Sequence, residues 1–236
     1  PDYRLDVTCH ADISEEVIRV LGFDNVNSTL PCLDTKLGAL TDVQSKEKLI
    51  RDYLLNNGLD ECLTYSLVSK TESNLFALAN NDELFKIINP LTEEREYFRG
   101  NILHSLLTSA SYNVARQNKD LALFEVSNIN TVNLNEKHLA IVLVGSSLNQ
   151  GYMKQESYDF FHMKGIFEGI CELLGIEPSR YRLERIKEHK DELHPGKAVD
   201  VIINNKKVGS FGEIHPNKLK EYDFGKTSVV VLELVL

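Results

Sequence analysis

The segment from Leu139 to Gly145 is almost entirely apolar, and it constrains the fold of this chain more than any other stretch. A strand with one solvent-facing side alternates between apolar and polar residues. A short, continuously apolar run is instead typical of a strand that is covered on both faces. We therefore expect residues 139–145 to lie in the middle of a sheet.

Several other stretches have the apolar spacing of a helix that packs one side against a core. The clearest runs from 101 to 117, where Ile102, Leu106 and Ala110 belong to one apolar stripe. Pro216 stands where a short helix commonly begins. The sequence predicts helices over 14–21, 43–57, 101–117, 160–174 and 216–222.

Short runs with strand character lie between these helices, and Asn204-Asn205 predicts a tight hairpin between two of them. The order of elements mixes helices with hairpin-linked strands and lacks a regular strand–helix alternation. We therefore predict an α+β fold, with a mostly antiparallel sheet flanked by helices. The expected strands cover 3–9, 62–68, 121–127, 139–145, 199–204, 207–211 and 228–235.

Residues 24–38 have the composition of an irregular linker, with Pro31, Gly38 and several Asn, Ser and Thr residues. The helix before this linker ends at Gly22, which suits a left-handed C-terminal cap. We place a domain boundary here. The sequence thus predicts the end of a small module over 1–38 and a main domain over 39–236.

The formal charge of −9 argues against this chain providing the main nucleic-acid-binding surface, because neutralising phosphates needs clustered Lys and Arg. One stretch, 180–190, leans basic through Arg180, Arg182, Arg185 and Lys187. Acidic residues dilute it, so a solvated charged face is the simpler interpretation and an RNA contact the alternative.

No run approaches the ~20 apolar residues of a membrane span, and the start does not resemble a signal peptide. We therefore expect a cytoplasmic protein without a membrane partner. The four cysteines are far apart and lack CxxC pairing, which predicts reduced packing residues. A start at Pro1 suggests a piece of a longer polypeptide.

Four carboxylates near the amino terminus could hold a metal ion: Asp6 on the first expected strand, then Asp12, Glu15 and Glu16 at the first helix. Magnesium prefers such oxygen ligands. The competing interpretation is structural, because Asp12 and Glu15 fit a helix cap with its capping-box partner. Glu15 could also pair with Arg19 four residues later.

The simplest nucleotide and nucleophile motifs are missing from the sequence. There is no Walker or dinucleotide-binding pattern and no GxSxG elbow. The histidines are scattered and do not suggest a metal or proton-shuttle set. We therefore expect no catalytic residue in this chain.

Six segments together resemble the beta chain of bacterial phenylalanine–tRNA ligase, in the order that this family shows. The resemblance spans nearly the whole chain, and it rests on the series of segments rather than on any one of them. The segments are PDYRLDV (1–7) with DISEEV (12–17), GFDNV with STLP (22–31), NPLTEE (89–94), YN with RQ (112–117), LFE (123–125), and HPG with GEIHP (194–196 and 212–216).

The resemblance implies that the first ~30 residues end a winged-helix-like module and that the rest is a degenerate class II synthetase core. The implied partner is the ligase alpha subunit in an alpha2beta2 heterotetramer, with tRNA(Phe) reached through the whole complex. ATP would be used by the complex and not bound by this chain. The family also implies a magnesium ion shared with the alpha subunit, at positions that match Asp6, Asp12, Glu15 and Glu16.

Class II adenylation relies on arginines that clamp the phosphates of ATP, one of them late in the fold. No arginine follows Arg185 in this chain, which favours catalytic silence. Arg99, in the segment that corresponds to the second class II motif, is a candidate anion ligand, but it lacks an evident late arginine partner and a salt bridge is the preferred interpretation. Two alternatives stay open at this point: a stand-alone adenylating enzyme that uses Arg99, and a tRNA-binding module.

The chain departs from the family pattern at two places. His104 replaces the proline of the family's LLPGLL helix start, and Ser127, Asn128 and Ile129 replace the residues that follow the LFE strand. These changes leave the predicted fold intact. They put the loop geometry beside that strand in question.

Overall fold

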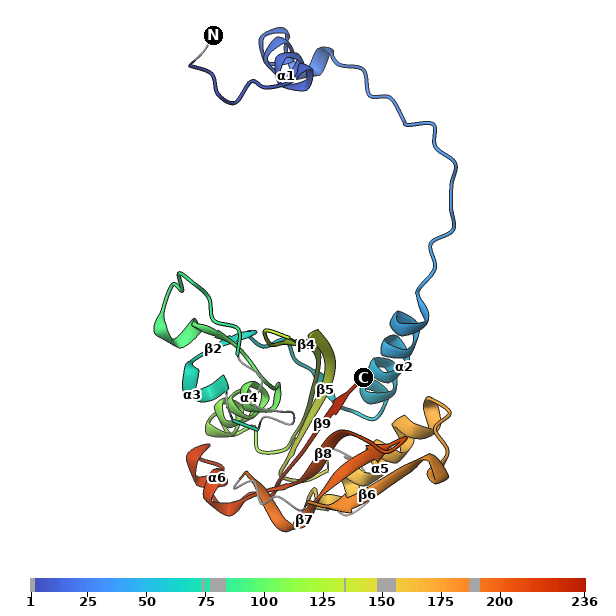
Figure 1. Ribbon diagram of the computed structural model, residues 1–236, viewed down its shortest axis with the longest axis vertical. Helices are drawn as coiled ribbons and strands as arrows, with labels where there is room; N and C mark the ends of the chain where they lie inside the picture. Colours follow the sequence, from blue (N-terminus) through green and yellow to red (C-terminus); the bar gives the residue numbers. More distant parts are fainter. Residues whose placement is uncertain (1–2, 74, 77–83, 134, 148–155, 187–191) are drawn as a thin grey trace. The chain divides into compact units, whose positions relative to one another are not determined.

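The computed structural model describes residues 3–73, 75–76, 84–133, 135–147, 156–186 and 192–236. Backbone contacts divide the chain into two units, Pro1–Leu40 and Thr41–Leu236 (Figure 1). This division lies beside the predicted linker. Each unit is described by itself below.

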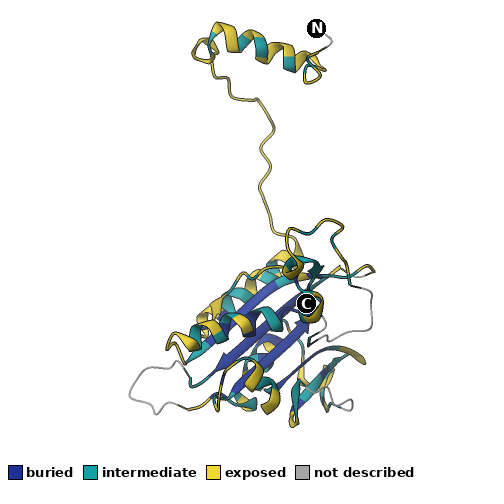
Figure 2. Cartoon of the chain, turned by 90° about the vertical axis from the view of Figure 1, so that its left-hand side faces the viewer, coloured by how far each residue is buried: buried dark blue, intermediate teal, exposed yellow. Residues whose placement is uncertain are grey.

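The first unit contains one helix, α1 (His10–Leu21), and a 3-10 turn, η1 (Phe23–Asn25). None of the residues of α1 is buried (Figure 2). The predicted strand over 3–9 is wrong, because these residues form turns. A strand needs a partner to satisfy its backbone groups, and no described segment of this unit supplies one. Gly22 has a positive φ of 93° with ψ of 131°, so the predicted left-handed cap is also wrong.

The second unit is built on a seven-stranded sheet, ordered β1-β4-β5-β9-β8-β7-β6. The pairing of β1 with β4 is parallel, and every other neighbour is antiparallel. The apolar run 139–145 falls in β5, between β4 and β9, which confirms its predicted place in mid-sheet. The strands are β1 (Asp60–Glu61), β4 (Leu121–Asn130), β5 (Asn135–Val144), β6 (Tyr181–Arg185), β7 (Leu193–Ile203), β8 (Lys206–Ile214) and β9 (Val229–Val235).

Helices cover both faces of this sheet (Figure 1). On one face α2 (Asp42–Asn56) and α5 (Phe160–Leu173) pack on a core that includes Ile141 and Leu232. On the other face α4 (Leu103–Ala115) packs on a core that includes Val142. Alternate residues of β5 therefore enter opposite cores, which explains why the strand has no polar side.

A small second sheet pairs β2 (Leu67–Val68) with β3 (Tyr97–Phe98) beside α3 (Lys70–Ser73) and η2 (Glu93–Arg95). The single strand predicted over 62–68 is therefore wrong, since the chain leaves the main sheet after β1 and joins a different one. The remaining elements are η3 (Pro178–Arg180) and α6 (Pro216–Glu221). None of the helices in the described ranges has the length and apolar character to cross a bilayer.

The predicted hairpin at Asn204-Asn205 is confirmed. These two residues have φ values of 51° and 64°, in the left-handed region that a two-residue type I′ turn requires. Asparagine tolerates this region better than most residues, because its short side chain can bond locally. The turn fixes the register of β7 against β8. Because β6 pairs with β7, the turn also sets where this edge strand lies along the sheet.

Candidate functional site

The acidic group at the start of α1 contains a helix cap, although a different one from that predicted. The N-cap residue is Cys9, and Asp12 lies at the third helical position. One oxygen of Asp12 accepts hydrogen bonds from the backbone N–H groups of Thr8 (2.7 Å) and Cys9 (2.8 Å). These backbone bonds lower the pKa of Asp12. Asp12 therefore reaches back to close the first turn, and Glu15 is not its capping partner.

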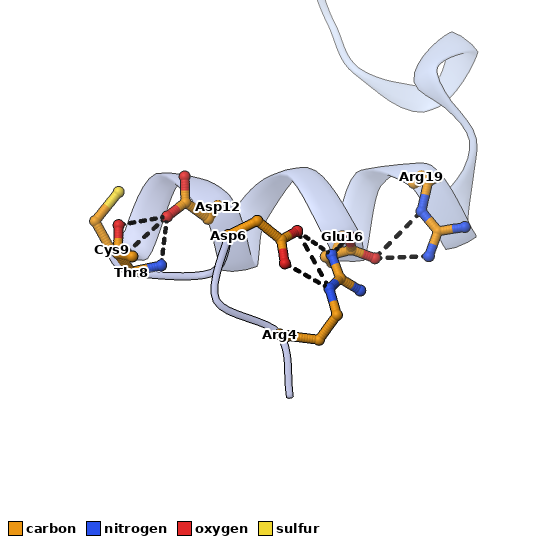
Figure 3. A network of polar contacts seen from close by, with 7 residues as sticks. All are labelled: Arg4, Asp6, Thr8, Cys9, Asp12, Glu16 and Arg19. Carbon is orange, nitrogen blue, oxygen red and sulfur yellow. Dashed lines mark hydrogen bonds and ion pairs between the residues drawn. The ribbon is translucent and has the colours of Figure 1, made fainter. Parts of the chain in front are cut away.

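Asp6 and Glu16 converge on one cationic group, the guanidinium of Arg4 (Figure 3). Arg4 Nη2 lies 2.7 Å from Asp6 Oδ2 and 2.6 Å from Glu16 Oε1. Arg19 Nη2 lies 2.6 Å from the other oxygen of Glu16, so Arg19 pairs with Glu16 and not with Glu15. Glu15 itself is exposed. The hydrogen bond from Arg4 lowers the pKa of Asp6 to about 2.

The donor chemistry of this group fits a magnesium ion in part. Two carboxylates already face one positive charge, and hard oxygen ligands are what magnesium prefers. One oxygen of Asp12 is occupied by the helix start, and Glu15 lies apart from the Arg4 network. Within the described ranges no three His, Cys, Asp or Glu side chains are placed to hold a metal ion. The structure thus brings together Asp6 and Glu16 among the four predicted ligands.

The Arg4–Asp6 pair predicts a measurable titration. Because the folded-state pKa of Asp6 is about 2 against an ordinary 3.8, its contribution to stability is present above about pH 4 and is lost as the pH falls through 2. Carboxyl NMR should show this low midpoint, and Arg4→Gln should return it toward 3.8. Asp12 is the internal control, because its pKa is lowered by backbone groups. A normal midpoint for Asp6 in the unaltered chain would contradict the pairing.

Arg99 is withdrawn from solvent and already paired. Its side chain is 2% exposed, and its Nη2 lies 2.5 Å from Glu125 Oε1. Its Nη1 donates to Thr64 Oγ1 (2.5 Å), and this hydroxyl donates to the second oxygen of Glu125 (2.6 Å). To bind an anion, the guanidinium would have to present two free N–H donors. Here its terminal N–H groups already bond to Glu125 and Thr64.

A second buried carboxylate lies on the same face of the sheet. Glu233 on β9 and Glu125 on β4 both pair in register with Ala140 of β5, so all three side chains share one face. Glu233 Oε1 lies 2.9 Å from His138 Nδ1 and accepts from the backbone N–H of Ile102 (3.2 Å). Because these bonds hold the segment that leads into α4, they attach that helix to the sheet.

Sequence reasoning missed both of these carboxylates. A signal was available, because each interrupts a strand that is otherwise apolar, in LALFEV (121–126) and VVVLELV (229–235). A lone charged residue in such a run is almost never buried without a partner. It therefore predicts a buried partner elsewhere in the fold.

The described part of the basic stretch, residues 180–186, does not bring its arginines into one patch. Arg182 and Arg185 lie on β6, the edge strand, and their odd spacing sends the two side chains to opposite faces of the sheet. Arg182 also donates to Asn205 Oδ1 (3.0 Å). Arg180 precedes the strand in η3, and Lys187 lies outside the described residues. Charged residues on an edge strand also discourage unwanted pairing with other chains.

A family model described as the phenylalanyl-tRNA synthetase beta chain CLM domain matches residues 26–236. The chain belongs to this beta-chain family. The match covers the whole of the second unit, and it confirms the resemblance drawn from the six segments.

Sequence similarity to individual members of the family also includes the first unit. The phenylalanine–tRNA ligase beta subunits of Staphylococcus aureus strains Mu50 and N315 are each 37% identical over 240 residues, covering 98% of this chain. The alignment covers 29% of the length of each of those subunits. The chain therefore spans less than a third of the curated relatives that it matches.

Two solved structures share the fold at low sequence identity. Pyrrolysyl-tRNA synthetase PylSc of Desulfitobacterium hafniense has a TM-score of 0.58 and 14% identity, covering 96% of this chain and 73% of that one. A crystal structure of pyrrolysyl-tRNA synthetase from the same organism has a TM-score of 0.61 and 12% identity, covering 96% and 74%. They confirm the predicted α+β synthetase-like fold. Fold likeness of this kind carries no activity by itself.

Proposed function

We propose that this chain is the non-catalytic core of a phenylalanine–tRNA ligase beta subunit. It supports the ATP-dependent attachment of phenylalanine to tRNA(Phe) by assembling with the alpha subunit in an alpha2beta2 heterotetramer. The family match over residues 26–236 carries this proposal. The complex reaches tRNA(Phe), and it works in the cytoplasm.

The internal pairing of Arg99 supports catalytic silence. A guanidinium that clamps phosphate must present its donors to the ligand, and that of Arg99 is turned to Glu125 and Thr64 instead. To bind ATP, the site would have to break a buried ion pair and leave Glu125 unpaired, which is strongly unfavourable. ATP is therefore used by the complex through residues of the alpha subunit.

The proposal includes a magnesium ion shared with the alpha subunit. Asp6, Asp12, Glu15 and Glu16 would hold it, as the family resemblance implies. The contacts of Asp6 and Glu16 with Arg4 support the assignment of these two carboxylates as ligands, because together they already stabilise one positive charge. A bound magnesium ion supplies a divalent charge that can join carboxylates of two chains. Arg4 would have to release both carboxylates for this.

ATP–pyrophosphate exchange tests the proposed silence. The purified chain should give no phenylalanine-dependent exchange, whereas a complex with the alpha subunit should give it readily. The matched control is Arg99→Ala, which removes the arginine in the segment that corresponds to the second class II motif. Exchange by the chain alone that disappears in Arg99→Ala would contradict the proposal and favour a stand-alone adenylating enzyme.

A further inference from the structure

His104, which stands where the family pattern has proline, connects three segments of the second unit that are distant in sequence. It is the second residue of α4. Its Nδ1 lies 2.6 Å from the hydroxyl oxygen of Tyr222, the residue that follows α6. Its Nε2 lies 3.4 Å from Oε1 of Glu72 on α3. A proline could make neither contact, because its side chain has no polar atom. We call Glu72, His104 and Tyr222 the His104 latch.

The carboxylate of Glu72 determines which ring nitrogen of His104 carries the proton. Glu72 Oε2 accepts a hydrogen bond from the backbone N–H of Ser69 (2.9 Å). Burial alone would raise the pKa of Glu72, but the hydrogen bonds from Ser69 outweigh it and lower that pKa. Glu72 is therefore an anion near neutral pH, and an ionised carboxylate can only accept. The proton of a neutral His104 ring then lies on Nε2, which leaves Nδ1 as an acceptor.

The hydroxyl of Tyr222 supplies the donor that this acceptor needs. Burial raises the pKa of Tyr222, and three nearby carboxylates raise it further. They belong to Glu221, Glu192 and Glu72. The hydroxyl therefore keeps its proton and donates it to Nδ1 of His104. The two rings also lie close together, with centroids 5.8 Å apart.

A positive charge on His104 is opposed by its surroundings. Its side chain is 14% exposed. Burial lowers the pKa of His104, and the carboxylate of Glu72 offsets only part of this effect. The ring also lies at the start of α4, where the helix dipole disfavours a cation. The other charged residues on the described elements that the latch joins, and in the segments next to them, are Lys70, Glu192, Lys218, Lys220, Glu221 and Asp223.

We propose that the His104 latch is an acid-sensitive connection, closed at neutral pH and opened when His104 takes up a second proton. In the charged ring both nitrogens are donors, so the hydroxyl of Tyr222 loses its acceptor and has to turn its proton away. The hydrogen bond described between α4 and the end of α6 is then lost. The latch lies wholly within the second unit, and it does not depend on assembly with the alpha subunit.

The direction of the pH effect follows from the lowered pKa of His104. Because the folded-state pKa lies below the ordinary 6.5, the folded chain binds fewer protons at this site than the unfolded chain. The contribution of the latch to stability is therefore present above about pH 6.5, and it is lost as the pH falls through the folded-state value. A single hydrogen bond of this kind changes the folding equilibrium ~2–10-fold.

Chemical denaturation of the 236-residue chain at about pH 7.5 and about pH 5.5 tests the latch. The comparison is with His104→Gln, because an amide can donate and accept but does not titrate in this range. Between the two pH values, the folding equilibrium of the unaltered chain should fall ~2–10-fold more than that of His104→Gln. Groups that titrate elsewhere are common to both chains and cancel. The matched control is His10→Gln, an exposed histidine on α1, which should keep the full pH dependence.

Nitrogen NMR of the histidine rings tests the same arrangement in the unaltered chain. The signals of His104, identified by their absence in His104→Gln, should show the Nε2–H tautomer at neutral pH and a titration midpoint below 6.5. Tyr222→Phe removes the hydroxyl and keeps the ring, so it should raise this midpoint. The proposal is overturned by the Nδ1–H tautomer, by a midpoint at or above 6.5, by an unchanged midpoint in Tyr222→Phe, or by equal pH dependence of stability in His104→Gln and the unaltered chain.

Discussion

Replacing Glu125 by alanine should lower the free energy of unfolding by about 3–5 kcal/mol, the usual cost of breaking a buried ion pair from one side. The substitution leaves the guanidinium of Arg99, 2% exposed, with Thr64 as its remaining described partner. Chemical denaturation of the purified chain measures the change. It should appear as a lower midpoint with little change in slope.

A double replacement distinguishes this cause from simple loss of packing. Arg99→Met with Glu125→Leu removes both charges and keeps apolar volume, so much of the lost stability should return. Arg99→Met alone should be destabilising, since it leaves Glu125 buried with Thr64 alone among the partners described here. If the double variant is as unstable as the sum of the two single ones, the ion pair is not what holds this region.

Phe211→Ala should cost about 3–5 kcal/mol of unfolding free energy, as is usual for a buried aromatic side chain. Phe211 on β8 is fully buried, and its ring stacks on that of Phe160 with centroids 5.1 Å apart. It also lies 5.7 Å from the ring of Phe167, so its removal opens a cavity under α5. Thermal or denaturant unfolding checks the size of the effect.

The neighbour of Phe160 gives a control of the same residue type. Phe161 is 71% exposed, so Phe161→Ala should change stability by no more than about 0.5 kcal/mol. Similar losses in the two variants would mean that α5 does not pack on the sheet through Phe211.

The long elements of the second unit could be predicted because the spacing of their apolar residues directly reflects which of their faces are buried. The apolar run 139–145 has no polar side since β5 is covered by α4 on one face and by α2 and α5 on the other. The errors fell on short segments whose state depends on distant partners. Residues 62–68 have strand character, but β1 pairs with β4 and β2 with β3, a split that no local pattern encodes.

The candidate site was predictable in composition and not in arrangement. The sequence placed Asp6, Asp12, Glu15 and Glu16 together. It could not show that Arg4 joins Asp6 to Glu16, which stands ten residues later in the chain, or that Asp12 closes the helix start. For Arg99 a salt bridge was preferred to an anion-binding role, and the pair with Glu125 confirms it. Its pairing with Glu125 depends on the sheet register, which is a property of the tertiary fold.

Co-purification with the alpha subunit, with and without EDTA, tests the central proposal most directly. The chain and the alpha subunit, co-expressed, should elute as one complex, and EDTA or a double Asp6→Asn, Glu16→Gln variant should weaken that complex. Lys48→Ala on α2 is the control, since its exposed pair with Asp52 lies outside the acidic group. A single stable complex is the result that the proposed assembly role predicts. Independent elution of the two chains under gentle conditions would contradict it.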